Sequence, residues 1–260
     1  MPFFQNNGVR YYSFDLFPRT VVQGVFTRQG GVSPAPWASL NVGGMVGDES
    51  HRVIENRTRS FASLGRRMDS LFDVWQVHSA DAIFAEAPRP PQADHHKADI
   101  IFTDRPGVTL YMRFADCVPI LLYDPRKNVV GIAHAGWLGT VRGAISAAVQ
   151  AMMSRYGSHA EDIQAAIGPS IGVDHYEVGT DVVGRVQGAF GAESGSLIQV
   201  RDGKTHFDLL AANRLQLEQA GVRQIEVAGI CTACHLEDWY SHRAERGKTG
   251  RFGALIALEA

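Results

Sequence analysis

Cysteine is scarce in this sequence, with three residues in 260, and an odd number argues against a disulfide framework. No apolar run approaches the roughly 18 to 20 residues that a membrane-spanning helix needs. The first residues, MPFFQNNGVRYYSFD, lack the basic start and continuous apolar stretch of a signal peptide. We therefore expect a soluble cytoplasmic protein that does not act at a membrane.

An excess of positive charge is also missing, because 25 Lys and Arg stand against 27 Asp and Glu. The resulting net charge of −2 gives no electrostatic footprint for a nucleic-acid partner. The Walker P-loop, the H-E-x-x-H zinc motif and the G-x-G-x-x-G dinucleotide motif are all absent. The sequence does not indicate an oligomeric state.

Strand-like apolar runs alternate with helical patterns along the whole chain. The segment 88–97, PRPPQADHHK, is polar and rich in proline, which predicts a surface loop. We interpret residues 1–260 as one mixed α/β (α+β) domain. The predicted strands are 21–26, 72–77, 98–103, 108–114, 118–124, 128–135, 163–168, 224–229 and 252–258, and the predicted helices are 48–64, 141–156, 179–190 and 208–220.

Three single residues, His78, Cys117 and His134, each lie at the edge of a strand-like run. His, Cys and His are zinc ligands, and three protein ligands leave a fourth tetrahedral position open, as in catalytic zinc sites. Taken singly, each His is more often a hydrogen-bonded loop residue and the Cys an inert buried thiol. The three become suggestive only as a group that the fold must bring together.

The segment Cys231-Thr232-Ala233-Cys234-His235 spells C-x-x-C-H, the attachment pattern of c-type haem. Such haem attachment normally needs export, and a single C-x-x-C supplies only half of a zinc ribbon. A redox dithiol or a second metal site is a minor alternative. We expect a coincidental pair at the end of a core strand, with both cysteines dispensable for activity.

Several polar residues lie in glycine-bearing loops, where a ligand can approach the backbone closely. They are Arg28 in TRQGG, Asn41 in SLNVG, and Arg243 and Arg251 in SHRAERGKTGR. The planar guanidinium of arginine suits phosphate and carboxylate groups. Any one of these arginines, taken alone, is most often a solvated surface residue.

These stretches, in this order, resemble the laccase-domain family of purine nucleoside phosphorylases, formerly described as multicopper polyphenol oxidases. The resemblance runs from residue 26 to the C-terminus, and ADCVP followed by HAGW is its most specific pair. It implies a mixed α/β domain with two mixed sheets and flanking helices. It also implies one zinc on His78, Cys117 and His134, with Gln76 in the matching segment VWQVHSADA near the substrate.

Three positions depart from the family pattern. Leu138 stands where the family usually has arginine after HAGW, Ala244 replaces the second arginine of SYRR, and Ser170 replaces a cysteine. The three positions of the metal ligands are intact. The resemblance therefore supports metal binding more strongly than phosphate binding.

The resemblance implies zinc-dependent phosphorolysis of adenosine, inosine, guanosine and methylthioadenosine to the free base and ribose 1-phosphate, with adenosine deamination as a further activity. Purine nucleoside and phosphate are then the expected partners. Arg28, Arg243 and Arg251 are the candidates for holding phosphate, with Asn41 and Gln76 as further substrate-binding residues. Asp116 is either a proton donor to the leaving purine or a support for the neighbouring ligand Cys117.

Three alternatives remain open from the sequence. A metal-free cysteine hydrolase would use Cys117 as nucleophile and His134 as base. A copper polyphenol oxidase would need an additional histidine-rich cluster, and the ten histidines include no H-x-H pair, so copper is less expected than zinc. A non-catalytic binding protein with a vestigial pocket would explain Leu138 and Ala244.

Overall fold

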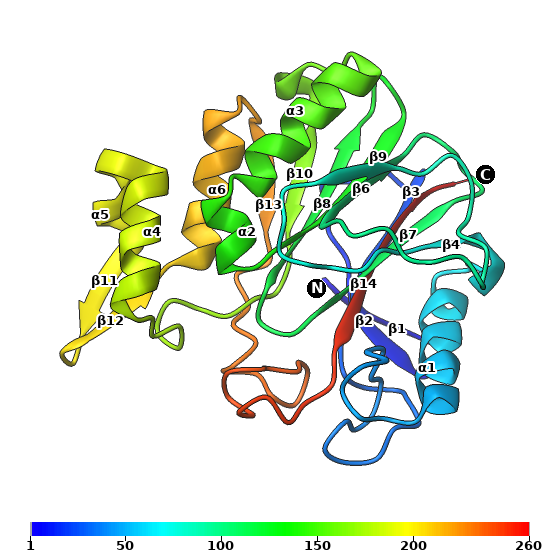
Figure 1. Ribbon diagram of the computed structural model, residues 1–260. Helices are drawn as coiled ribbons and strands as arrows, with labels where there is room; N and C mark the ends of the chain where they lie inside the picture. Colours follow the sequence, from blue (N-terminus) through cyan, green and yellow to red (C-terminus); the bar gives the residue numbers. More distant parts are fainter. Residues whose placement is uncertain (1, 260) are drawn as a thin grey trace.

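A computed structural model describes residues 2–259 of the chain and is drawn as a ribbon in Figure 1. Two six-stranded mixed sheets form its centre, and a two-stranded hairpin projects at one side. The first sheet has the strand order β1-β2-β3-β14-β7-β4, and the second has the order β13-β10-β8-β9-β6-β5. This arrangement confirms the mixed α/β fold with two sheets and flanking helices.

Most neighbouring strands are antiparallel, and the parallel pairs lie at the sheet edges: β4 with β7, β5 with β6, and β13 with β10. The first sheet contains β1 (Phe3–Asn6), β2 (Val9–Tyr12), β3 (Val21–Phe26), β14 (Phe252–Leu258), β7 (Thr109–Phe114) and β4 (Leu71–Phe72). The second contains β13 (Gln224–Val227), β10 (Gln164–Ile167), β8 (Val118–Asp124), β9 (Val129–Ala135), β6 (Ile100–Thr103) and β5 (Ala82–Phe84). The hairpin pairs β11 (Ile198–Arg201) with β12 (Lys204–Phe207).

The helices are α1 (Ser50–Ser63), α2 (Trp137–Val141), α3 (Ala144–Tyr156), α4 (Thr180–Phe190), α5 (Ser194–Leu197) and α6 (Leu209–Gln219), with short 3₁₀ turns η1 (Met68–Ser70), η2 (Ala160–Asp162) and η3 (Gly191–Glu193). Helix α1 packs against the first sheet, α3 and α6 pack against the second, and α4 and α5 lie at one side with the hairpin (Figure 1). Asp208 caps α6, its carboxylate accepting a hydrogen bond from the Ala211 backbone. Gly157 ends α3 in a left-handed conformation. Within residues 2–259, no helix combines the length and the apolar character needed to cross a bilayer.

Alternation along the strands explains why four layers form. On β7, Leu110 and Met112 join the core between the two sheets, whereas Tyr111 joins the cluster that contains Phe61 of α1. The strands of the second sheet alternate likewise between that central core and the cluster formed with α3 and α6. The central strands therefore bury both faces, because successive side chains point to opposite sides. Substrates can reach only the edges and strand ends.

The structure corrects several of the predicted elements. Of the predicted strand 72–77, only Phe72 joins a sheet, as part of β4 (Leu71–Phe72). From Asp73 on, the segment is an irregular loop with one bridge from Trp75 to Lys97. The short strands β1, β2, β5, β11 and β12 were not predicted. The short helix α2, which precedes α3, was not predicted either. Segment 88–97 is irregular, as expected.

The close packing of β6 on β9 gives a testable prediction. Gly131 of β9 lies opposite Phe102 of β6, and a methyl group at position 131 would overlap the Phe102 ring. Because both residues are fully buried, Gly131→Ala should lower the free energy of unfolding by about 1–3 kcal/mol in urea denaturation. Gly107→Ala is the matched control, since nothing lies within 4 Å of the added methyl. Equal denaturation midpoints for the two variants would contradict this packing argument.

Candidate functional site

The register of three strands brings the central residues together. Cys117 directly precedes Val118 of β8, which pairs with Ala135 of β9, so the thiol lies beside His134. Ile100 of β6 pairs with Ala133 on the other side of β9, which places Asp99 next to the same histidine. The meeting of Cys117 and His134, 17 positions apart, is thus a direct result of strand pairing, whereas His78 lies on a loop outside the sheets.

Asp99 joins the histidine of the sheet to the loop that carries the second histidine. One carboxylate oxygen lies 2.8 Å from His134 Nδ1, and the other accepts hydrogen bonds from the backbone of Val77 and Ser79, which flank His78. His78 itself adopts a left-handed backbone conformation with φ of 58°. Arg142 donates to the His78 carbonyl at 2.8 Å and completes the support of this loop.

The donor atoms of His78, Cys117 and His134 all lie within 4.8 Å of one another. The Cys117 sulfur is 3.9 Å from His78 Nε2, and the two imidazole centroids are 4.9 Å apart. Gly136 allows this approach: a Cβ there would lie 2.7 Å from His78 Cδ2 and 2.8 Å from the Cys117 sulfur. These three residues therefore form a group that could hold a metal ion.

The ionisable side chains of this group shift one another's pKa. Burial alone would raise the pKa of the Cys117 thiol, but the charge and hydrogen bond of His134, with a hydrogen bond from His78, lower that pKa to about 6. Burial opposes protonation of His134, yet Cys117 and Asp99 raise its pKa to about 9. The pKa of Asp99 is lowered, because its hydrogen bonds to His134, Ser79 and Val77 outweigh its burial. Cys117 and His134 thus each favour the charged form of the other.

The chemistry of the donor set fits a transition metal. Two imidazoles and one thiolate suit zinc and copper, and three protein ligands leave a coordination position open. Asp99 supplies the carboxylate that typically orients a metal-binding histidine and fixes its tautomer.

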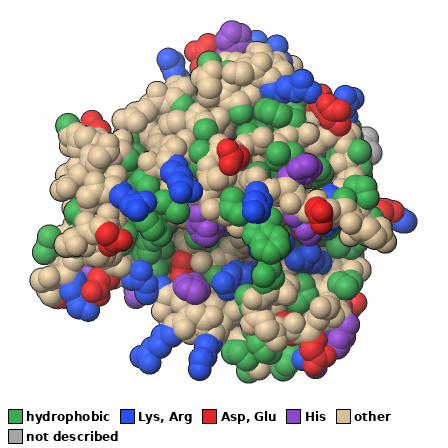
Figure 2. Space-filling view, viewed as in Figure 1, with side chains coloured by type: hydrophobic (Ala, Val, Ile, Leu, Met, Phe, Trp, Pro, Cys, Tyr) green, Lys and Arg blue, Asp and Glu red, His purple; other side chains and the backbone are tan. Residues whose placement is uncertain are grey.

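A cavity of about 790 Å³ opens over this group. The face shown in Figure 2 is hollowed near its centre, and Lys or Arg and His side chains gather there. Among the described residues that line the cavity, one carboxylate, Asp116, stands against four arginines, Arg57, Arg113, Arg243 and Arg251, and two histidines, His95 and His242, lie among them. Aromatic side chains line it as well, namely Trp75, Trp137 and Tyr176. The size is typical of a small-molecule site.

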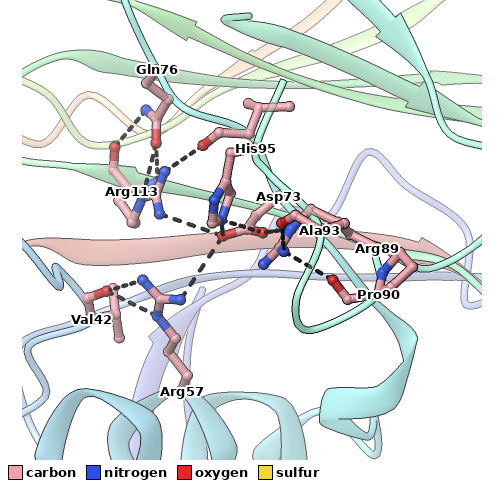
Figure 3. Close-up of polar contacts among 10 residues, drawn as sticks. Val42, Arg57, Asp73, Gln76, Arg89, Pro90, Ala93, His95 and Arg113 are labelled. Carbon is pink, nitrogen blue, oxygen red and sulfur yellow. Dashed lines mark hydrogen bonds and ion pairs between the residues drawn. The ribbon is translucent and has the colours of Figure 1, made fainter. Parts of the chain in front are cut away.

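Behind one wall, Asp73 is the centre of an arginine cluster that the sequence analysis missed (Figure 3). Its carboxylate lies 2.8 Å from Arg89, 3.4 Å from Arg113 and 3.9 Å from Arg57, and 3.2 Å from His95. Burial would raise the pKa of Asp73, but these cations hold it below its usual range. One buried carboxylate thus orders three arginines and leaves a net positive charge facing the cavity.

Gln76, Asp116, Arg243 and Arg251 border the cavity, as the sequence suggested. Gln76 contacts Arg113, accepting from its backbone N–H at 3.0 Å and its Nε at 3.2 Å. Both Asp116 carboxylate oxygens are occupied, one by the Thr232 hydroxyl and one by the Arg243 backbone, each at 2.7 Å. These bonds favour the role of Asp116 as support for the Cys117 turn.

Arg28 and Asn41 lie outside the described lining of the cavity. The Arg28 guanidinium donates to the Ala38 and Leu236 carbonyls and pairs with Glu245 at 3.1 Å. Asn41 is fully buried, and its side-chain oxygen accepts from the backbone of Gly43 and Arg251. Both residues thus shape the loops that border the cavity, and their direct role in substrate binding stays a prediction.

Residues 168–172, GPSIG, also match the G-x-S-x-G pattern of a nucleophile elbow. That pattern needs a strand, a sharp turn and a helix in succession, whereas α4 begins only at Thr180. Ser170 is 2% exposed, and its hydroxyl has no hydrogen-bond partner. The serine is therefore not placed as a nucleophile.

Comparison with known proteins identifies the family. Residues 22–259 match the family described as multi-copper polyphenol oxidoreductase laccase, and the chain belongs to it. The chain is 41% identical over 242 residues to the purine nucleoside phosphorylase of Deinococcus radiodurans, covering 93% of this chain and 91% of that one. It is 34% identical over 249 residues to purine nucleoside phosphorylase YlmD of Bacillus subtilis, covering 93% and 90%.

Solved structures agree with this assignment. YlmD from Geobacillus stearothermophilus superposes with a TM-score of 0.92 at 36% identity, covering 100% of this chain and 99% of the other. The hypothetical protein YfiH of Bacillus licheniformis gives a TM-score of 0.89 at 33% identity, covering 99% of both chains. The resemblance to this family that the sequence motifs indicated is confirmed.

A prediction follows from the position of Asp99. In Asp99→Asn the amide nitrogen would face either His134 or the Val77 and Ser79 N–H groups, so one set of hydrogen bonds is lost. Zn²⁺ affinity, measured by competition with a chromophoric chelator, should fall by about 10- to 100-fold. Asp81→Asn, an exposed change near the same loop, should leave the affinity unchanged. An unaltered affinity in folded Asp99→Asn protein would show that the carboxylate is not needed.

Proposed function

We propose that this protein is a zinc-dependent purine nucleoside phosphorylase, converting nucleosides such as adenosine, inosine, guanosine and methylthioadenosine to the free base and ribose 1-phosphate. The observation that carries the proposal is a cationic and aromatic cavity directly above a metal-binding triad. Relatives named purine nucleoside phosphorylase at 34–41% identity support it.

Phosphate would be held by arginines of the cavity wall. Arg57 and Arg113 are fixed by Asp73, so their charges are already oriented before a ligand arrives. Arg243 lies opposite, donating to the Glu177 carbonyl at 2.7 Å with its guanidinium 5.1 Å from the Tyr176 ring centre. Phosphorolysis develops positive charge on the sugar, and a phosphate held beside it would stabilise that charge. Arg57 and Arg113 would supply positive charge here, although Leu138 and Ala244 stand where the family usually has arginine.

The purine would lie against the aromatic part of the lining. Trp75 is 48% exposed although it is large and apolar, and it borders the cavity. Trp137 and Tyr176 add two further rings. Burying such flat apolar surface against a purine ring is favourable, with a further gain from ring stacking. Such a surface would favour a ligand that carries a flat aromatic base.

Zinc would be held by His78, Cys117 and His134, and when bound it supplies a Lewis acid at the bottom of the cavity. Asp99 keeps the Nδ1 side of His134 occupied, so Nε2 faces the cavity. Asp116 holds the Cys117 turn to the segments that contain Thr232 and Arg243. These contacts fix the ligands and one phosphate-binding residue relative to each other.

A metal-free cysteine hydrolase is the second candidate, and the pairing of Cys117 with His134 favours it. Cys117, His134 and Asp99 follow the order of nucleophile, base and orienting carboxylate. The lowered pKa of Cys117 would supply a thiolate at neutral pH. The metal content of protein purified from zinc-replete medium separates the two candidates, and it also decides between zinc and copper.

The direct test is to incubate the protein with each of the four nucleosides, with and without phosphate, and to identify the products. Ribose 1-phosphate formed only with phosphate supports phosphorolysis. Free ribose would indicate hydrolysis, and inosine formed from adenosine would indicate deamination. Absence of ribose 1-phosphate from every nucleoside would contradict the proposed function.

A prediction concerns Arg243. Removing one charge-assisted hydrogen bond costs about 1.5–3 kcal/mol, which corresponds to an affinity loss of about 10- to 150-fold. Arg243 is partly open to solvent, so Arg243→Ala should raise the KM for phosphate towards the lower end of this range. Its backbone bond to Asp116 remains, so zinc content should not change.

Lys248→Ala is the matched control, because Lys248 is an exposed cation of the same loop outside the described cavity lining. It should leave the KM for phosphate unchanged. An Arg243→Ala enzyme with the parent's dependence on phosphate would remove Arg243 from the phosphate site.

A further inference from the structure

A second group of possible metal ligands lies outside the cavity. It consists of Asp174, His175, Cys231 and Cys234. The expectation that the C-x-x-C pair ends a core strand is wrong: β13 ends at Val227, and Cys234 is exposed. Because β10 and β13 are parallel neighbours, the loops that follow them start at the same end of the sheet, where both strands have their carboxyl ends. Parallel pairing thus brings segment 170–175 beside segment 231–234.

The distances within this group match a tetrahedral zinc site. Zn–S bonds of about 2.3 Å and Zn–N or Zn–O bonds of about 2.1 Å at tetrahedral angles separate sulfur from nitrogen or oxygen by roughly 3.6 Å. His175 Nδ1 lies 3.8 Å from the Cys231 sulfur and 3.6 Å from the Cys234 sulfur. The Cys234 sulfur lies 3.9 Å from Asp174 Oδ2, which is 3.1 Å from His175 Nδ1. One ion would fit between all four donors with small adjustments.

The backbone around the group is arranged to stabilise a thiolate. The Gly172 N–H donates to the Cys231 sulfur at 3.2 Å, and a bridge between Ser170 and Cys231 holds the two segments in parallel. A Cβ at position 172 would lie 2.6 Å from Asp174 Oδ1 and 3.2 Å from the Cys231 sulfur. Glycine is therefore required for the donors to approach one another as they do.

We propose that Asp174, His175, Cys231 and Cys234 bind a second, structural zinc ion. Four protein donors close the tetrahedron and leave no position for substrate, unlike the three donors below the cavity. Two thiolates suit zinc better than the hard cations, which prefer oxygen ligands. Both cysteines would bind as thiolates, so binding releases their protons.

This ion would brace one border of the cavity. Thr232, between the two cysteines, donates to Asp116, and the backbone of Ile171 donates to the Asp116 carbonyl. His175 directly precedes Tyr176, whose ring lines the cavity. Joining the two segments therefore fixes the turn before Cys117 and one aromatic wall, although the ion itself stays outside the cavity.

Metal analysis of the full-length protein tests the proposal. Wild-type protein purified under reducing conditions with zinc should contain two zinc ions per chain, and Cys234→Ser should contain one. Cys117→Ser should also contain one, because it affects only the group below the cavity. Equal zinc content in wild-type and Cys234→Ser protein would overturn the second site. A loss confined to Cys117→Ser would leave the proposed function standing without it.

Thiol reactivity gives a second measurement that needs no variant. Cys234 is exposed, so a free thiol there would be accessible to a thiol reagent such as dithionitrobenzoate at alkaline pH. With zinc bound, Cys231 and Cys234 should react slowly and become fast after a strong chelator is added. Rapid reaction before chelation, or a Cys231–Cys234 disulfide in protein kept under reducing conditions, would contradict zinc binding.

Discussion

The carboxylate of Asp99 is the contact on which the site depends. It is buried at the start of β6 and binds a sheet residue, His134, through one oxygen and the His78 loop through the other. Strand pairing fixes Asp99, Cys117 and His134 relative to each other, but nothing in the sheets fixes His78. One buried carboxylate thus holds a loop residue, His78, in place beside the donors that the sheets already fix.

A similar arrangement sets the charge of the cavity. Asp73 lies behind the wall and gathers Arg57, Arg89 and Arg113, so cations that would repel one another are held side by side. Their desolvation is offset by the buried carboxylate, and the excess positive charge faces the space where an anion would bind. The candidate metal-binding group and the arginine-lined wall are therefore each organised by one aspartate outside the cavity.

The sequence predicted the central strands well, because runs such as 118–124 and 252–258 are apolar on both faces. It missed short edge strands such as Phe3–Asn6, where burial is slight and the pattern weak. It singled out His78, Cys117 and His134 because these residue types can bind zinc and each lies at the edge of a strand-like run, and the structure brings them together. Asp73 and Asp99 could not be found, because aspartate is common and their importance comes from pairing across the fold. The partners of Cys231 and Cys234 lie nearly 60 residues earlier in the chain and were missed for the same reason.

The cavity lies at strand ends, so the residues that determine folding differ from those that shape the cavity. Both faces of each central strand are packed, so changes there affect folding before they affect chemistry. The borders of the cavity come from loops, and Met45 at one of them is 79% exposed. A substitution at such a border residue can alter the shape offered to a nucleobase while the donor set and the sheets remain intact. The architecture can therefore acquire new substrate preferences by loop changes alone.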